Sequence, residues 1–179
     1  MALLRGINVG RAKRIAMADL RALVAALGYT DVQTLLNSGN VVFTAPADVR
    51  GDPAARIEQA VAKQLNVGSR VTVLTARELD DAVTRNPLAD VADDPSRLLV
   101  SVLADPKDVA KLRPLTRESW APEVLALGPR VAYLWIPAGV IQSKLAKAVD
   151  RVLGDAVTAR NWSTMRKLHD LVHPPGEGK

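Results

Sequence analysis

Apolar residues recur along the first part of the chain at two spacings, one typical of strands and the other of helices. Short runs rich in valine, leucine and isoleucine predict strands at 2–7, 32–36, 41–45 and 71–74. Apolar positions three or four residues apart predict a helix at 17–27 that ends at Gly28, and a second helix that Pro53 opens. These elements follow one another in the order βαββαβ.

The same order returns in the second half, after a connecting helix near 78–84 and a loop rich in proline and aspartate. Strands are predicted at 98–103, 124–127, 131–136 and 156–159, with helices at 106–112, at 141–153 and after Asn161. We therefore expect an α+β fold of two tandem ferredoxin-like βαββαβ units packed together, plus a C-terminal helix. The expected segments are a first unit at 1–76, a connecting helix and loop at 77–96, a second unit with the terminal helix at 97–173, and a flexible tail at 174–179.

Composition narrows the class of protein. Of the 179 residues, 48% are hydrophobic, which is enough to bury a core. The absence of cysteine excludes disulfides, thiolate catalysis and zinc or iron–sulfur centres held by cysteine. No run of about 18 apolar residues is present, and Arg5 interrupts the apolar start, so neither a transmembrane helix nor a signal peptide is predicted. We expect a cytoplasmic bacterial protein.

The basic excess lies at the two ends of the chain. The formal charge is +5 in total. Residues 1–40 hold five basic and two acidic side chains, and residues 156–179 hold four basic and two acidic ones. The remaining residues hold 15 basic and 15 acidic side chains, so their charges balance. We therefore expect the two ends to form one electropositive surface, with Arg5 and Arg160 in a shared cleft.

The first candidate site combines the loop after the first strand with the first hairpin turn. In the expected topology the third strand lies between the first and the second, so residues 6–10 emerge beside residues 37–40. Arg5, Asn8, Ser38 and Asn40 would then contact an anion with help from exposed backbone amides. The alternative is structural, because glycine and asparagine are also what a tight turn requires.

The second candidate site is the segment before the last helix. Arg160 stands where a strand ends and Asn161 where the helix begins, so a guanidinium beside a helix N-terminus would suit phosphate or carboxylate. Arg11, Lys13 and Lys167 would contribute to the surrounding positive field. The alternative is a capped helix with a solvated basic face.

Metal and paired-carboxylate chemistry have weaker signals. His169 and His173 are four residues apart, but they lie at the end of the last helix before Pro174. Adjacent aspartates, Asp80 with Asp81 among them, do not face each other on a helix and are better explained as solvated surface. We assign no metal ligand and expect no cofactor.

A nucleic-acid interface is a further hypothesis for the function of this chain. Tyr133 and Trp135 alternate onto one face of a predicted strand, as the stacking aromatics of single-stranded RNA binders do. The chain has only six aromatic side chains of the Phe, Trp and Tyr types, and several strands are apolar on both faces. Both observations favour burial of the two rings over stacking on bases.

Several motifs together resemble the bacterial domain-of-unknown-function 1697 family over nearly the whole chain. They are LLRGINVG at 3–10, Met17 with Leu20, SGNVVF at 38–43, Gly139 with SKL at 143–145, and TARNWST at 158–164 with Lys167 and Leu168. The resemblance implies the tandem ferredoxin-like architecture but no established activity, substrate or cofactor. Arg11 departs from the pattern, since family members usually have a glycine there, and it would narrow or re-aim the loop.

The residues favour a protein that binds a phosphorylated or otherwise anionic small ligand in a basic cleft. One alternative is an enzyme acting on a phosphate ester or nucleotide, with arginines stabilising charge and a divalent metal supplied by the substrate; it lacks an evident general base. The other is an RNA-binding or protein-interaction module.

Overall fold

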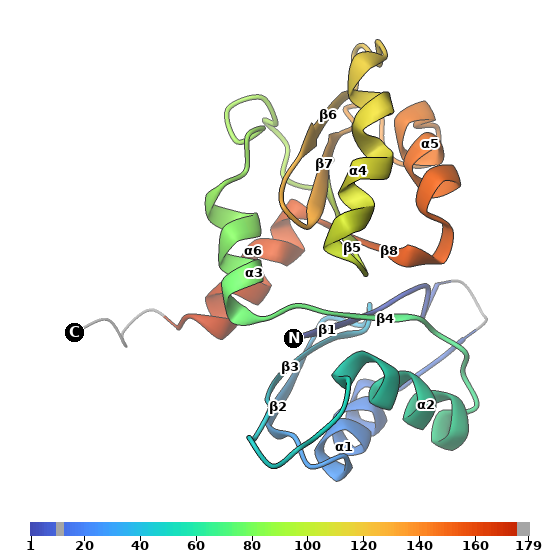
Figure 1. Cartoon of the computed structure of the whole chain (residues 1–179), viewed down its shortest axis with the longest axis vertical. Helices are drawn as coiled ribbons and strands as arrows, with labels where there is room; N and C mark the ends of the chain where they lie inside the picture. Colours follow the sequence, from blue (N-terminus) through green and yellow to red (C-terminus); the bar gives the residue numbers. More distant parts are fainter. Residues whose placement is uncertain (10–12, 175–179) are drawn as a thin grey trace. The chain divides into compact units, whose positions relative to one another are not determined.

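The computed structural model describes residues 1–9 and 13–174, which form a mixed α+β chain with six α-helices and two four-stranded antiparallel sheets (Figure 1). The α+β prediction is confirmed. The chain divides into two compact units, Met1–Thr75 and Ala76–Lys179. None of the helices in the described residues is both long enough and apolar enough to cross a membrane.

The first unit contains one sheet and two helices. Its elements are, in order, β1 (Ala2–Leu4), α1 (Met17–Ala26), β2 (Thr30–Leu35), β3 (Asn40–Thr44), α2 (Pro53–Leu65) and β4 (Val71–Val73). The strands are arranged β2-β3-β1-β4, and each bonded pair is antiparallel. Strand β3 therefore lies between β1 and β2, so the loop after β1 and the β2–β3 hairpin emerge at the same end of the sheet.

Both helices of the first unit cover one face of its sheet. Alternation along β1 directs Ala2 and Leu4 into the core while Leu3 points to the other face. The helix residues that pack against Ala2 and Leu4 include Leu20, Leu23, Val24, Ile57, Ala60 and Val61. Strand β1 is shorter than the predicted 2–7, because Gly6 and Asn8 adopt positive φ values of 65° and 56° that end the extended conformation.

The second unit has the same order of strands and connecting helices, preceded by one additional helix and followed by another. Its elements are α3 (Ala76–Thr84), β5 (Leu98–Leu103), α4 (Val109–Leu112), β6 (Val124–Leu127), β7 (Val131–Trp135), α5 (Lys144–Leu153), β8 (Val157–Asn161) and α6 (Trp162–Val172). The strand order is β6-β7-β5-β8. Short 3-10 turns occupy Pro106–Asp108, Arg113–Arg117 and Gly154–Ala156.

The second unit departs from its predicted boundaries at α5 and β8, and one predicted helix begins with a 3-10 turn. The helix predicted at 141–153 begins at Lys144, because the Ser143 hydroxyl accepts a hydrogen bond from the Ala146 amide at 2.8 Å and caps it there. The helix predicted at 106–112 starts with a 3-10 turn capped by Asp105. Strand β8 extends to Asn161, so Arg160 lies within the strand rather than after it.

Different helices pack against the two faces of the second sheet. Along β7, Ala132 and Leu134 belong to the core that also contains residues of α4 and α5. Tyr133 points to the opposite face, and its hydroxyl donates a 2.8 Å hydrogen bond to the carbonyl of Ala82 in α3. Tyr133 is 0% exposed and Trp135 is 9% exposed. The predicted burial of both rings is confirmed, and helix α3 supplies part of the cover.

We expect Tyr133 to ionise only in strongly alkaline solution. Burial raises the pKa of its phenol from 10.0 to about 12, and the Asp81 carboxylate adds to the rise. The folded pKa exceeds the ordinary one, so the stability due to the neutral phenol is intact below pH 10 and is lost as the pH passes 12. The chain has two tyrosines, so in Tyr29→Phe the tyrosinate absorbance reports Tyr133 alone and should have a midpoint near 12. An ordinary midpoint in the folded variant would contradict this burial.

Candidate functional site

Residues 5–14, which we call the basic loop, belong to the connection between β1 and α1, and the side chain of Asn8 bridges this connection. Its Nδ2 donates hydrogen bonds to the carbonyls of Ile15 at 2.9 Å and Asn37 at 2.8 Å. Its Oδ1 accepts from the Ile15 amide at 2.9 Å, and its backbone amide donates to the Lys13 carbonyl at 3.0 Å. The side chain of Asn8 thus links the segment after β1 to Ile15 and to the hairpin.

These bonds give Asn8 an internal role. Its φ of 56° lies in the left-handed region, which asparagine adopts more readily than most residues. Both amide hydrogens are used within the protein. A direct contact from this amide to an anion, as predicted, would require one of the two bonds to break.

The hairpin turn packs directly on the basic loop. The Leu4 amide donates to the Gly39 carbonyl at 2.8 Å, and Asn8 reaches Asn37, so the predicted adjacency of the two segments is confirmed. Asn40 is buried, and its Nδ2 donates to the Leu35 carbonyl and the Ser38 hydroxyl, both at 2.9 Å. Ser38 itself is exposed.

The cations of the basic loop differ in exposure. Arg5 is half-buried and its backbone is fixed, since its amide donates to the Arg70 carbonyl at 2.8 Å. Lys13 and Arg14 are exposed, and neither forms an ion pair with any residue that the structure describes. Arg11 lies outside the described residues. The loop therefore presents at least two cations to solvent.

In the second unit, the junction of β8 and α6 holds the other predicted residues. The Asn161 Oδ1 accepts from the Thr164 amide at 2.9 Å, which caps α6. Arg160 is 9% exposed, and its Nη1 donates to the Ala159 carbonyl at 2.8 Å. Burial lowers the pKa of this guanidinium to about 10, so it remains charged at neutral pH. Lys167 is exposed on α6.

Strand register places Arg160 on a defined face of the second sheet. Val100 lies directly opposite both Tyr133 and Arg160. Residues opposite one another in antiparallel strands share a face, so Arg160 lies on the face that carries Tyr133. The structure thus groups Asn8, Ser38 and Asn40 in the first unit, and Arg160 with Asn161 in the second. That Arg5 and Arg160 share one cleft stays a prediction.

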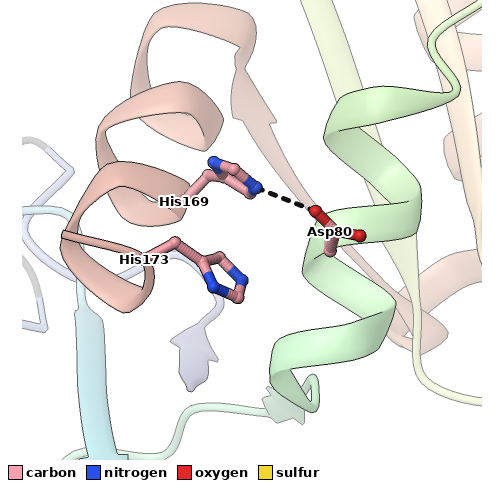
Figure 2. Close-up of side chains that lie close together, drawn as sticks. All are labelled: Asp80, His169 and His173. Atoms are coloured by element: carbon pink, nitrogen blue, oxygen red, sulfur yellow. Dashed lines mark hydrogen bonds and ion pairs between the residues drawn. The ribbon is translucent and has the colours of Figure 1, made fainter. Parts of the chain in front are cut away.

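A further cluster joins α3 to α6 (Figure 2). The Nε2 of His169 lies 3.1 Å from Oδ1 of Asp80, and the rings of His169 and His173 have centroids 4.7 Å apart. The spacing of the two histidines was visible in the sequence. Asp80 was missed because it lies 89 positions from His169, so no local spacing could indicate it.

The two sheets with their helices define a mixed α+β protein, with basic residues in its loops and histidines at a helix end. The chain belongs to the family described as "Protein of unknown function (DUF1697)", whose model matches residues 1–133. The family expected from the motifs is confirmed.

A solved structure supports the fold beyond the matched region. The chain is similar to "conserved bacterial protein SP0830 from Streptococcus pneumoniae", with a TM-score of 0.75 and 24% sequence identity over 96% of each chain. No curated protein matches the chain.

Proposed function

We propose that the protein binds a phosphorylated or otherwise anionic small ligand, and that the basic loop is the principal site. Four of the ten residues at 5–14 are basic and none is acidic. The observation that favours binding is the Asn8 tether, because it fixes the backbone at Asn8 and Ile15 while Lys13 and Arg14, just before Ile15, stay exposed without a carboxylate partner among the described residues. A backbone segment that is already fixed loses little conformational entropy when the side chains beside it bind a ligand.

We also propose that both units are ferredoxin-like. Each has the element order βαββαβ, and each has its first strand beside its third and fourth strands. In the first unit both helices pack on one face of the sheet. This arrangement brings the basic loop and the hairpin turn to one end of the sheet, where Arg5 and Ser38 complete the proposed site and the buried Asn40 supports Ser38 through its hydrogen bond.

Arg160, Asn161 and Lys167 form the second part of the proposal. A buried guanidinium next to the start of an eleven-residue helix suits an anionic group, since the helix N-terminus has a partial positive charge. We expect Arg160→Lys to weaken ligand binding, because an ammonium cannot replace a two-pronged guanidinium contact. Calorimetric titration with inorganic phosphate and pyrophosphate measures this loss.

The experiment is a titration of the full chain with inorganic phosphate, pyrophosphate and a nucleoside monophosphate, followed by calorimetry and thermal shift. In Lys13→Ala/Arg14→Ala we expect the affinity for the best of these probes to fall about tenfold or more, since each charge-assisted contact contributes about 1.5–3 kcal/mol. The matched control is Arg21→Ala/Lys63→Ala, which removes the same charge from exposed positions on α1 and α2. Equal losses in both variants, or no binding of any probe, would refute a site at the basic loop.

The RNA-binding alternative stays a prediction that the two aromatic rings do not favour. Tyr133 and Trp135 were its candidate stacking surface, and both rings are buried. Single-stranded RNA should therefore leave the fluorescence of Trp135 unchanged at low salt, measured in a variant in which Trp120 and Trp162 are replaced by phenylalanine.

A further inference from the structure

Three candidate metal-binding side chains converge between two helices of the second unit. Asp80 comes from α3, His169 from the last turn of α6, and His173 from the residue that follows α6. One ligand atom of each lies within 4.8 Å of those of the other two. Figure 2 shows the carboxylate and both rings directed toward the space between the helices. We propose that these residues bind a divalent transition-metal ion, and that Zn²⁺ is the ion the donor set fits best.

The distances are close to those that a zinc ion needs. With nitrogen and oxygen ligands at about 2.0–2.2 Å in tetrahedral geometry, neighbouring ligand atoms are about 3.3 Å apart. Nε2 of His169 and Oδ1 of Asp80 already lie 3.1 Å apart. His173 is exposed and follows the helix, so rotation of its side chain can bring its ring nitrogen inward.

The chemistry of the donors selects the ion. Two imidazoles and one carboxylate suit zinc and its neighbours in the transition series, whereas calcium and magnesium require mostly oxygen ligands. Three protein ligands leave a coordination position for water or another small molecule. The second carboxylate near the ring, Asp170, lies 4.0 Å from Nδ1 of His169, the ring nitrogen that does not face Asp80.

The location makes the site accessible and locally ordered. The side chain of His169 is 21% exposed and that of Asp80 is 48% exposed, so an ion can enter from solvent. The backbone at His173 is held by its amide, which donates to the His169 carbonyl at 2.8 Å. A bound ion would replace the Asp80–His169 hydrogen bond as the link between α3 and α6, because Nε2 must give up its proton to bind a metal.

The chain is well suited to a direct test, since it has two histidines and no cysteine. Any ion that imidazole binds in the untagged full-length chain must therefore use His169 or His173. We would titrate this protein with Zn²⁺ by calorimetry and with Co²⁺ by visible absorption. The expected result is one ion per chain and a Co²⁺ spectrum typical of nitrogen and oxygen ligands.

Three variants assign the ligands. Loss of a residue that merely supports a ligand weakens metal binding about 10–100-fold, so Asp80→Asn, His169→Gln and His173→Gln should each weaken Zn²⁺ binding at least about tenfold. Asp81→Asn is the matched control, because Asp81 is the next residue of α3 and pairs instead with Arg85 at 3.1 Å. We expect its Zn²⁺ affinity to equal that of the wild type.

Two results would overturn the site. Failure of the wild type to bind Zn²⁺ or Co²⁺ saturably at one ion per chain is the first. The second is wild-type affinity in Asp80→Asn, which would mean that the two histidines chelate the ion as a surface pair without α3. His173→Gln changes an exposed side chain outside the helix, so it keeps the test valid if His169→Gln fails to fold.

Discussion

Gly39→Ala is expected to destabilise the first unit by about 3 kcal/mol. The residue has a φ of 76°, and a left-handed conformation is unfavourable for alanine by about 1–2 kcal/mol. An added Cβ would also lie 2.8 Å from both Cδ1 of Ile7 and Cβ of Leu4. Cβ of Leu4 belongs to strand β1 and cannot rotate away, and overpacking of this kind costs about 1–3 kcal/mol. Urea unfolding followed by far-ultraviolet circular dichroism measures the loss.

Two other glycines separate the causes of this effect. Gly6 has a φ of 65°, but the methyl group of an alanine at this position would have no neighbour within 4 Å, so Gly6→Ala should show only the conformational cost, about 1 kcal/mol. Gly68 has neither feature, and Gly68→Ala should lie within about 0.5 kcal/mol of the wild type. If Gly39→Ala were no worse than Gly6→Ala, the close packing of the hairpin on the basic loop would be disproved.

The bounds of a strand were predictable where recognisable residues stand at both of its ends in the sequence. Strands Leu98–Leu103 and Val124–Leu127 have their predicted bounds, because polar or turn-forming residues flank an apolar run on both sides. The start of α5 was misjudged because Ile141 fits the helical period of apolar residues. Ile141 is 86% exposed and precedes the Ser143 cap, so its apolar character says nothing about the helix.

The candidate sites show what local sequence can and cannot reveal. The adjacency of the basic loop and the hairpin followed from strand order, and the Asn8–Asn37 hydrogen bond confirms it. The internal use of the Asn8 amide could not be predicted, because it depends on where the Ile15 and Asn37 carbonyls point. The same holds for Asp80, whose proximity to His169 depends on how α3 and α6 pack.

Asn8→Ala is expected to destabilise the first unit by about 3 kcal/mol and to loosen the basic loop. The substitution removes three side-chain hydrogen bonds, and it leaves the amide and carbonyl of Ile15, a buried residue, without these partners. A typical intramolecular hydrogen bond contributes about 1 kcal/mol. Alanine also tolerates the φ of 56° less well than asparagine. Hydrogen exchange at the Ile15 amide should accelerate along with the loss of global stability.

Asn8→Gly and Asn37→Ala serve as controls for this interpretation. Asn8→Gly removes the same hydrogen bonds but relieves the backbone strain, so it should recover about 1 kcal/mol of the loss while Ile15 exchange stays fast. Asn37→Ala should be close to wild type, because Asn8 binds its backbone carbonyl and not its side chain. Since the proposed anion site depends on a fixed loop, Asn8→Gly should weaken phosphate binding even though every cation remains. Normal protection of Ile15 in Asn8→Ala would show that the loop is held by other contacts, and the case for a preorganised anion site would fail with it.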